Sequence, residues 1–196
     1  GNDQSPLAFN RAKLYSGKAL DFDGTNDSVI VADDNSLDFT TAMSAFCYVR
    51  VDSLTSVDDY ILSKYDYGNN KRGWVMLQDN GQLWVLISKN GLSGSTNAKF
   101  YKADVFLNTS DYYFVGFTFS SNVLKLYVNG QEVEVNKHHD PEVNSIYTTD
   151  VNIGIGNGHY NGGIANYFNG KISNPRLFNT ALTAAQVADL YNNPEK

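Results

Sequence analysis

Several features that often define a protein class are scarce in this sequence. The chain of 196 residues contains one cysteine, Cys47, so no disulfide can form within it. It contains no run of about 18 apolar residues, which excludes a membrane-spanning helix and predicts no membrane insertion. No secretory signal peptide is visible near the start. The fold must therefore rest on a hydrophobic core, and a chain of this length can bury a large one.

Positive charge is scarce as well. The sequence has 15 lysines and arginines against 21 aspartates and glutamates, which gives a formal net charge of −6. This balance argues against nucleic acid as a partner, because binding to phosphates needs clustered positive charge. Acidic oxygens suit hard cations such as Ca²⁺, although solubility alone explains most of these charges equally well.

Helical periodicity is also nearly absent, and strand and turn signals fill the chain instead. Asn80-Gly81 and Asn129-Gly130 predict two tight hairpins, because Asn-Gly readily adopts the positive φ angles of a type I′ turn. Short apolar or alternating runs bounded by turn residues are typical of strands. We expect strands at residues 19–22, 29–31, 43–51, 60–64, 73–78, 82–88, 112–120, 123–128, 131–135, 151–155 and 171–179.

This many strands, with turns between them, predict an all-β antiparallel β-sandwich of two sheets. Thr183 and Gln186 have the spacing of a capping box, which predicts one short C-terminal helix that ends at 192–194. Strands and helices do not alternate, so an α/β nucleotide-binding fold is excluded. We therefore expect a single domain over residues 1–196, with an irregular N-terminal segment at 1–17.

Three segments of the chain carry a family resemblance. They are LDFDG at 20–24 with Asp27 close behind, LKLYVNG at 124–130, and the closing stretch from NGKI at 169–172 to Leu182. Together they resemble the laminin-G-like members of the concanavalin A-like lectin/glucanase superfamily, over nearly the whole chain. The resemblance implies a concanavalin A-like jelly roll with one concave face open to ligand. It also implies a carbohydrate-binding or adhesion module, and a calcium ion near the joined termini.

The turn at 23–27 is the candidate calcium site. Asp23, Asn26 and Asp27 offer carboxylate and amide oxygens within five residues, and Ca²⁺ binds six to eight oxygens. By the resemblance, Asn174 or Ser173 on the last strand would complete the site and tie the termini together. The alternative is an Asp-Gly turn whose side chains make local hydrogen bonds. A second oxygen cluster at 33–35 has a solvated turn as its alternative.

Two polar loops, near 64–74 and 158–167, hold the residue types that bind sugars. Aromatic rings pack on the C–H faces of a sugar, and Asp, Asn, Arg and His side chains meet its hydroxyl groups. Trp84 or Tyr101 could form the floor of such a cleft. For Trp74 and Trp84, the alternative is a place in the hydrophobic core. The candidate ligand-binding residues are Tyr65, Asp66, Tyr67, Asn69, Arg72, Trp74, Trp84, His159, Tyr160 and Asn161.

Enzymatic patterns are weak in this sequence. A retaining glycosidase needs two carboxyl groups about 5–5.5 Å apart. The only comparable pattern is Glu132-Val133-Glu134, and no third carboxylate follows it, because position 136 is an asparagine. No Gly-x-Ser-x-Gly motif is present. His138-His139 could suggest a transition metal, but adjacent side chains on an extended chain point to opposite sides, so we expect a loop there. We predict no catalytic residues.

These observations favour a non-catalytic carbohydrate-binding or adhesion module that belongs to a larger extracellular, cell-surface or virion-surface protein. Its expected partners are a glycan or polysaccharide and the other domains of that protein, and Ca²⁺ is expected in a structural role. The alternative is a structural or protein-binding module of a surface or phage protein. A glycoside hydrolase is the third alternative, and the carboxylate pattern disfavours it.

Overall fold

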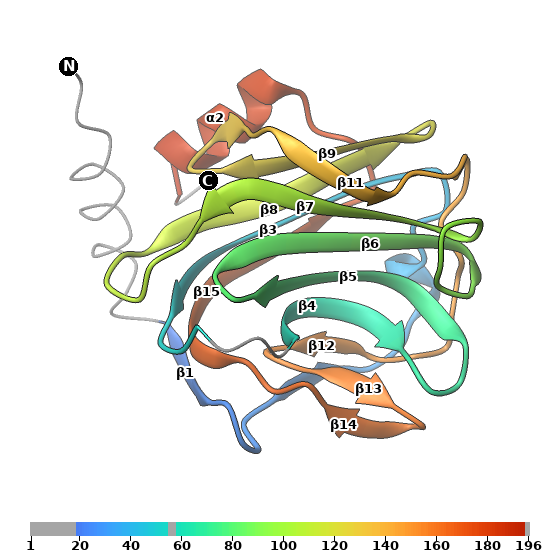
Figure 1. The fold of residues 1–196 in the computed structure, drawn as a ribbon, viewed down its shortest axis with the longest axis horizontal. Coiled ribbons are helices and arrows are strands. Elements are labelled where there is room, and N and C mark those ends of the chain that lie inside the picture. The colour runs from blue at the N-terminus through green and yellow to red at the C-terminus, as the bar shows by residue number, and fades with distance from the viewer. Residues whose placement is uncertain (1–18, 55–57, 195–196) are drawn as a thin grey trace.

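Two β-sheets lie face to face in the computed structural model, which describes residues 19–54 and 58–194 (Figure 1). The predicted antiparallel sandwich with one short C-terminal helix is therefore confirmed. The prediction of an irregular segment at 1–17 lies outside the described residues. Of the helices that the structure describes, none is long and apolar enough to cross a membrane.

The strands divide unequally between the two sheets. The six-stranded sheet has the order β1 (Leu20–Asp23), β15 (Asn169–Phe178), β3 (Ala42–Val51), β8 (Tyr113–Ser120), β9 (Val123–Val128) and β10 (Gln131–Glu132). The nine-stranded sheet has the order β11 (Val135–His139), β7 (Ala98–Phe106), β6 (Gln82–Gly91), β5 (Lys71–Asp79), β4 (Asp59–Asp66), β12 (Ile153–Ile155) and β2 (Val29–Val31). Its remaining two strands, beside β4, form the hairpin of β13 (Gly158–Tyr160) and β14 (Gly163–Ala165).

The inner faces of the two sheets bury one hydrophobic core. Alternation along each strand decides which side chains point inward. In β5, Trp74 and Met76 join the core between the sheets, whereas Val75 and Leu77 belong to a separate cluster. In β3, Cys47 faces the core, and burial raises the pKa of its thiol. The core thus needs no disulfide to hold the sheets together.

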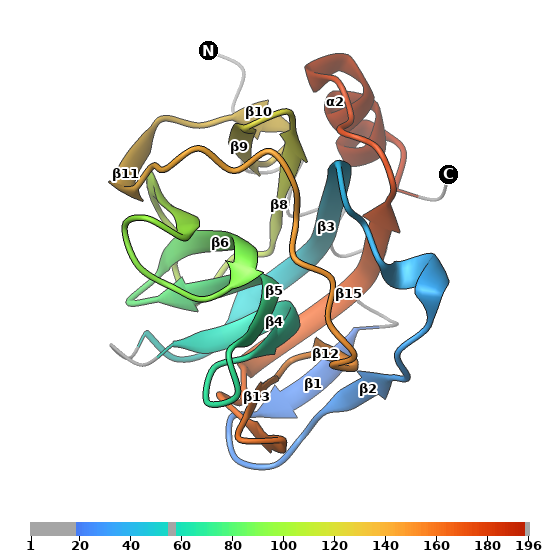
Figure 2. The same ribbon diagram turned by 90° about the vertical axis from the view of Figure 1, so that its right-hand side faces the viewer.

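A helix covers the outer face of the six-stranded sheet. The helix α2 (Ala184–Asn192) lies beside β3 and β8 (Figure 2). It packs Val187 and Tyr191 against Phe46, Tyr48 and other aromatic side chains that point away from the core. The predicted capping box is present, since the Thr183 hydroxyl accepts from the Gln186 amide at 3.3 Å. No helix that the structure describes lies over the outer face of the nine-stranded sheet, so that face stays open (Figure 1).

The turns and chain ends behave as the sequence predicts. Asn80 and Asn129 have φ angles of 49° and 52°, and the glycines that follow them are also left-handed, so both hairpin turns are confirmed. The first and last strands of the described chain pair side by side, with Leu20 opposite Ile172. This pairing closes the sandwich near the 23–27 turn.

Several strands were not predicted. Residues 98–106 form β7, and the expected loop at 157–169 contains the short strands β13 and β14. The expected strand at 131–135 divides into β10, which pairs with β9, and β11, which pairs with β7 in the other sheet. The expected loop at His138-His139 was also wrong, because these residues end β11. β11 pairs with β7 and β13 pairs with β4, both distant in sequence, whereas β7 and the hairpin of β13 and β14 also have partners close in sequence.

Candidate functional site

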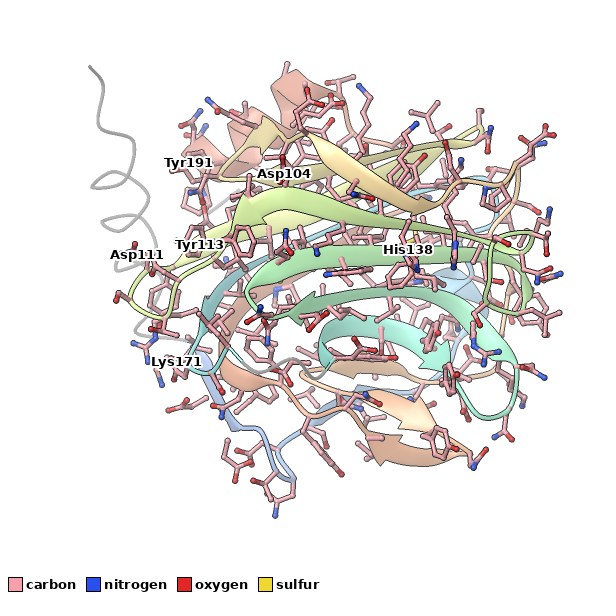
Figure 3. The ribbon with its side chains drawn as sticks, viewed as in Figure 1. Asp104, Asp111, Tyr113, His138, Lys171 and Tyr191 are labelled. Carbon is pink, nitrogen blue, oxygen red and sulfur yellow. The ribbon has the colours of Figure 1, made fainter. Side chains whose placement is uncertain are left out.

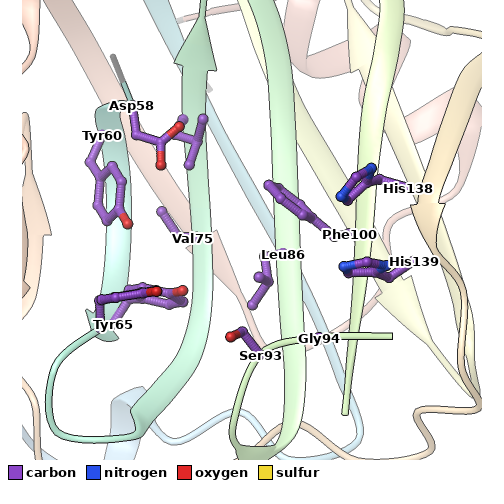
Figure 4. Close-up of a pocket in the computed structure, with 12 residues that line it drawn as sticks. Asp58, Tyr60, Tyr65, Val75, Leu86, Ser93, Gly94, Phe100, His138 and His139 are labelled. Carbon is purple, nitrogen blue, oxygen red and sulfur yellow. The ribbon is translucent and has the colours of Figure 1, made fainter. Parts of the chain in front are cut away.

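A pocket of about 240 Å³ lies on the open outer face of the nine-stranded sheet (Figure 4). Its floor comes from side chains that alternate outward on β4, β5, β6 and β7: Tyr60, Val75, Leu77, Leu86 and Phe100. Four of these five side chains are largely buried although they point away from the core, because they pack against one another in one cluster. The floor is therefore apolar and is shaped by rigid strands.

One wall of the pocket is built from tyrosines at the end of β4. Tyr65 and Tyr67 both line the pocket, as their period-two spacing suggested. Tyr67 is 50% exposed and stacks on Tyr160 of the neighbouring hairpin, with 6.0 Å between ring centroids. The Arg72 guanidinium lies 4.5 Å from the centre of the Tyr67 ring. These contacts hold an exposed aromatic ring at the rim.

The opposite wall consists of two adjacent histidines. A bulge between Lys137 and His139 shifts the register of β11 against β7, and the His138 and His139 rings lie only 4.3 Å apart. Both rings contact Phe100 on the pocket floor, and Figures 3 and 4 show His138 over β6 and β7. The expectation that the two side chains point to opposite sides was therefore wrong, because it assumed a strand without a bulge.

Asp66 joins the two predicted polar loops. Its carboxylate accepts hydrogen bonds from the Gly68 amide at 3.1 Å, from the Asn69 side chain at 2.9 Å and from the Gly162 amide at 2.7 Å. Burial alone would raise the pKa of Asp66, but these hydrogen bonds outweigh burial and hold the pKa below its ordinary value. The loops at 64–74 and 158–167 therefore share one edge of the sheet. Asp66 itself is only 2% exposed and supports them from behind.

The other loop candidates take different places. Asn69 and Asn161 are exposed, and the Asn161 side chain lies where a Cβ on Gly68 would collide with it, so the loops fit closely. His159 was expected at the surface but is 7% exposed. Burial lowers the pKa of His159, with Asp66 opposing this effect. The His159 side chain thus lies behind the loops rather than at the ligand-accessible surface.

The two tryptophans separate cleanly. Trp74 is 1% exposed and packs in the core against Phe117, so the structure removes it from the ligand-accessible face. Trp84 points outward beside the pocket, where its ring lies 4.6 Å from that of Phe100. Tyr101, the other candidate for the floor, faces the core and donates its hydroxyl to Asp140. A ligand-binding role for the outward-facing candidates stays a prediction.

Several residues of the pocket were missed by the sequence prediction. Phe100 and the two histidines come from the strands that were not recognised. A signal for Phe100 was present, since residues 98–106 alternate between Phe100 and Lys102 on one face and Tyr101 and Ala103 on the other. No local signal marks the bulge that brings the histidines together.

The candidate calcium residues do not converge. One Asp23 carboxylate oxygen accepts from the Thr25 and Asn26 amides at 2.8 and 3.2 Å, and Asp27 accepts from the Asp23 amide at 3.0 Å. Hydrogen bonds from Thr25 and Asn26 lower the pKa of Asp23. Asn174 lies far along β15, because Asp23 pairs with Asn169 instead. In the described ranges, no three His, Cys, Asp or Glu side chains gather around a point.

Asn174 is therefore a correction to the predicted calcium site: five residues of strand separate it from the pairing point, a distance of roughly 16 Å, and its amide donates to Pro194. Calcium at the 23–27 turn alone would need further backbone oxygens, and it stays a prediction. In the second oxygen cluster, Asp33 pairs with the buried Lys64 ammonium, which also pairs with Asp38 outside the cluster. An internal cation thus offsets part of the negative charge there.

The chain belongs to a lectin-like family. The family described as the concanavalin A-like lectin/glucanases superfamily matches residues 23–188, which is most of the chain. The sequence resemblance is thereby confirmed. No protein with a curated description matches the chain.

Solved structures share the fold at low sequence identity. The CBM40 module of the Ruminococcus gnavus IT-sialidase, bound to α2,3-sialyllactose, matches with a TM-score of 0.66 at 12% identity, over 88% of this chain and 97% of that one. The receptor-binding domain of the botulinum neurotoxin C/D mosaic serotype matches with a TM-score of 0.65 at 17% identity, over 88% and 41%.

A third structure is a Bacteroides ovatus protein provisionally described as carbohydrate binding. It matches with a TM-score of 0.63 at 18% identity, over 87% of this chain and 45% of that one. This chain thus spans less than half of the length of the Bacteroides and neurotoxin structures. At these identities the likeness establishes the jelly-roll fold.

Proposed function

We propose that this domain is a non-catalytic glycan-binding module, and that it holds a terminal sugar in the pocket on the open face of the nine-stranded sheet. The observation that carries the proposal is the aromatic-walled pocket with an exposed Tyr67 ring at its rim. A pocket of about 240 Å³ is smaller than the range of about 300–1,000 Å³ typical for drug-sized ligands. This size suits the end of a glycan.

The chemistry of the pocket matches that of a sugar. The apolar floor, with Phe100 and Leu86, can pack against the C–H face of a pyranose ring. The rim carries groups that hydrogen-bond hydroxyls, among them Ser93 and the two histidines. The strands hold the floor residues and the two histidines in place without ligand, and the Asp66 hydrogen bonds hold the loops beside Tyr67, which lowers the entropy cost of binding.

The arrangement of carboxylates supports a binding role over a hydrolytic one. Asp58 is the single carboxylate among the described residues that line the pocket, and glycoside hydrolysis generally uses a pair. Glu132 lies in β10 of the other sheet and pairs with Lys125 at 2.8 Å. Glu134 lies between β10 and β11, directly before Val135, and does not line the pocket either.

The comparisons support the same proposal in a broader way. Structures with this fold include a module bound to sialyllactose and a toxin receptor-binding domain, and several are parts of longer chains. We infer that this domain likewise belongs to a larger extracellular or surface protein. Weak binding at one site would then be strengthened by several copies acting together.

A glycan array followed by calorimetric titration tests the proposal. We expect saturable binding to one class of glycan, and Tyr67→Ala should weaken it by about 3- to 10-fold, the contribution of one aromatic contact. Phe106→Ala is the matched control, because Phe106 is 63% exposed on β7 but lies outside the pocket. Equal binding by the two variants would contradict the proposed site. No binding to any glycan would favour a protein-binding module.

A further inference from the structure

A buried cation lies behind the tyrosine wall without a counter-ion. Arg72 is 6% exposed, and its guanidinium donates to neutral acceptors only, the Asn70 side chain at 2.6 Å, the Gly91 carbonyl at 3.1 Å and the Tyr67 carbonyl. Its Nε has no hydrogen-bond partner, and no carboxylate of the described chain lies within 4 Å. Buried charges are usually paired, so this one leaves positive potential at the wall.

The opposite wall presents two imidazole rings to the pocket. Imidazole side chains ordinarily take up a proton as pH falls from 8 to 5. The bulge in β11 places His138 and His139 together at the pocket, and neither ring forms an ion pair within the described residues. An anion that entered between the two walls would meet the positive potential of Arg72 on one side and imidazole N–H donors on the other.

Other charged groups near the histidines do not cancel this field. Lys102 extends over the Trp84 ring beside the pocket, with its ammonium 5.0 Å from the ring centre. Asp140, which follows the histidines, already accepts from Lys99 at 2.5 Å and from Lys137 at 3.2 Å. The Asp140 carboxylate is thus neutralised where it stands.

The other titratable groups that line the pocket include Tyr65, Tyr60 and Asp58. Burial raises the pKa of Tyr65 to about 12, and it also raises that of Tyr60, so both hydroxyls stay neutral. Asp58 is the one acidic group that lines the pocket. Burial, assisted by the charge of Asp79, raises the pKa of Asp58, which reduces its negative charge in acidic solution.

We propose that the pocket selects anionic glycans, with a carboxylate or sulfate of the sugar placed against the His138–His139 wall, and that this binding strengthens as pH falls from neutral to mildly acidic. The proposal rests on the proposed function of the pocket and names the class of glycan. The negative charge of the protein as a whole, −6, makes the local positive walls more selective, because other surfaces repel the same ligand.

Matched pairs of glycans, each with and without a charge, test the proposal at pH 5.5 and pH 7.5. The pairs are methyl glucuronide with methyl glucoside, 3′-sialyllactose with lactose, and 6-sulfo-N-acetylglucosamine with N-acetylglucosamine. We expect one charged member to bind about tenfold more tightly than its neutral partner at pH 5.5, and this preference to shrink several-fold at pH 7.5. Comparison of the carboxylated pairs with the sulfated pair shows whether the pocket prefers a carboxylate or a sulfate group.

Variants assign the effect to residues. His138→Asn with His139→Asn should remove the pH dependence, and Lys125→Gln, which removes an exposed cation from the other sheet, should leave it unchanged. If thermal melting shows that the double variant is unfolded, the exposed His138 is replaced alone. Asp58→Asn should tighten binding of the charged glycan by a few-fold, since it removes the opposing charge.

Three outcomes would overturn the inference. Equal affinity for charged and neutral glycans at both pH values would refute the anionic preference and leave the glycan-binding function standing. Weaker binding of the charged glycan by Asp58→Asn would show that the carboxylate attracts the ligand, which the inference forbids. If no glycan binds at either pH, both the proposed function and the inference are refuted.

Discussion

Both outer faces of the sandwich carry packed aromatic side chains, but a described helix covers only one of the two faces. On the six-stranded sheet, Phe46 and Phe114 stack on each other and the helix α2 covers them. On the nine-stranded sheet, Trp84 and Phe100 also pack together, but no described helix lies over them. Aromatic residues on an outer face thus indicate function only where nothing in the fold covers them.

The inner and outer tryptophans give the largest contrast. Trp74→Ala should destabilise the fold by about 3–5 kcal/mol, because it opens a large cavity in a packed core. Trp84→Ala should cost less than about 1.5 kcal/mol, since its ring is partly exposed and packs on one side. Urea denaturation of both variants measures the difference, and equal losses would contradict the placement of the two rings.

A charge buried under the helix α2 should disrupt its packing on the six-stranded sheet. Val187→Asp should lower the free energy of unfolding by about 3 kcal/mol or more, because Val187 is fully buried against the aromatic cluster. Ala185→Asp in the same helix is the control, since Ala185 is exposed, and it should change stability by less than about 0.5 kcal/mol. Thermal melting checks both. If Val187→Asp is as stable as the control, the helix does not dock as described.

The open face depends on the joint between its two loops. Asp66→Asn should cost about 1–3 kcal/mol at pH 7, because a buried carboxylate accepts several hydrogen bonds there. The folded pKa of Asp66 is lowered, so its contribution is present above the unfolded pKa of about 3.9 and is lost as pH falls through the folded value. Denaturation of both proteins at pH 7 and pH 3 should show the gap narrowing. A gap that widens in acid would contradict this assignment.

Calcium should have the smallest effect on stability. The 23–27 turn holds itself with hydrogen bonds to Asp23 and Asp27, so we expect chelation with EDTA to lower the Tm by less than about 2 °C. The Tm of the Asp23→Ala variant should also fall by less than about 2 °C when EDTA is added. A large loss of Tm in EDTA that Asp23→Ala abolishes would establish a tightly bound ion at the turn.

The sequence predicted the scaffold better than the site, for physical reasons. The hairpin turn at Asn80-Gly81 and the helix cap at Thr183 depend on neighbours within four residues, and both were correct. The two-residue turn at Asn80-Gly81 pairs Leu77 with Trp84 and so places Trp74 and Trp84 on opposite faces, but local sequence does not tell which face is the core. The bulge before His139 depends on β7, which lies over 30 residues away and could not be inferred from local spacing.

The most direct test of the account uses one tryptophan from each region. In a ¹⁵N–¹H NMR spectrum the two indole N–H signals can be assigned with Trp74→Phe and Trp84→Phe, because the chain has two tryptophans. We predict that adding the glycan identified on the array shifts the Trp84 signal, beside the pocket, and leaves the Trp74 signal in place. A saturating glycan that shifts neither signal would show that it binds elsewhere, and the open face would lose its proposed role.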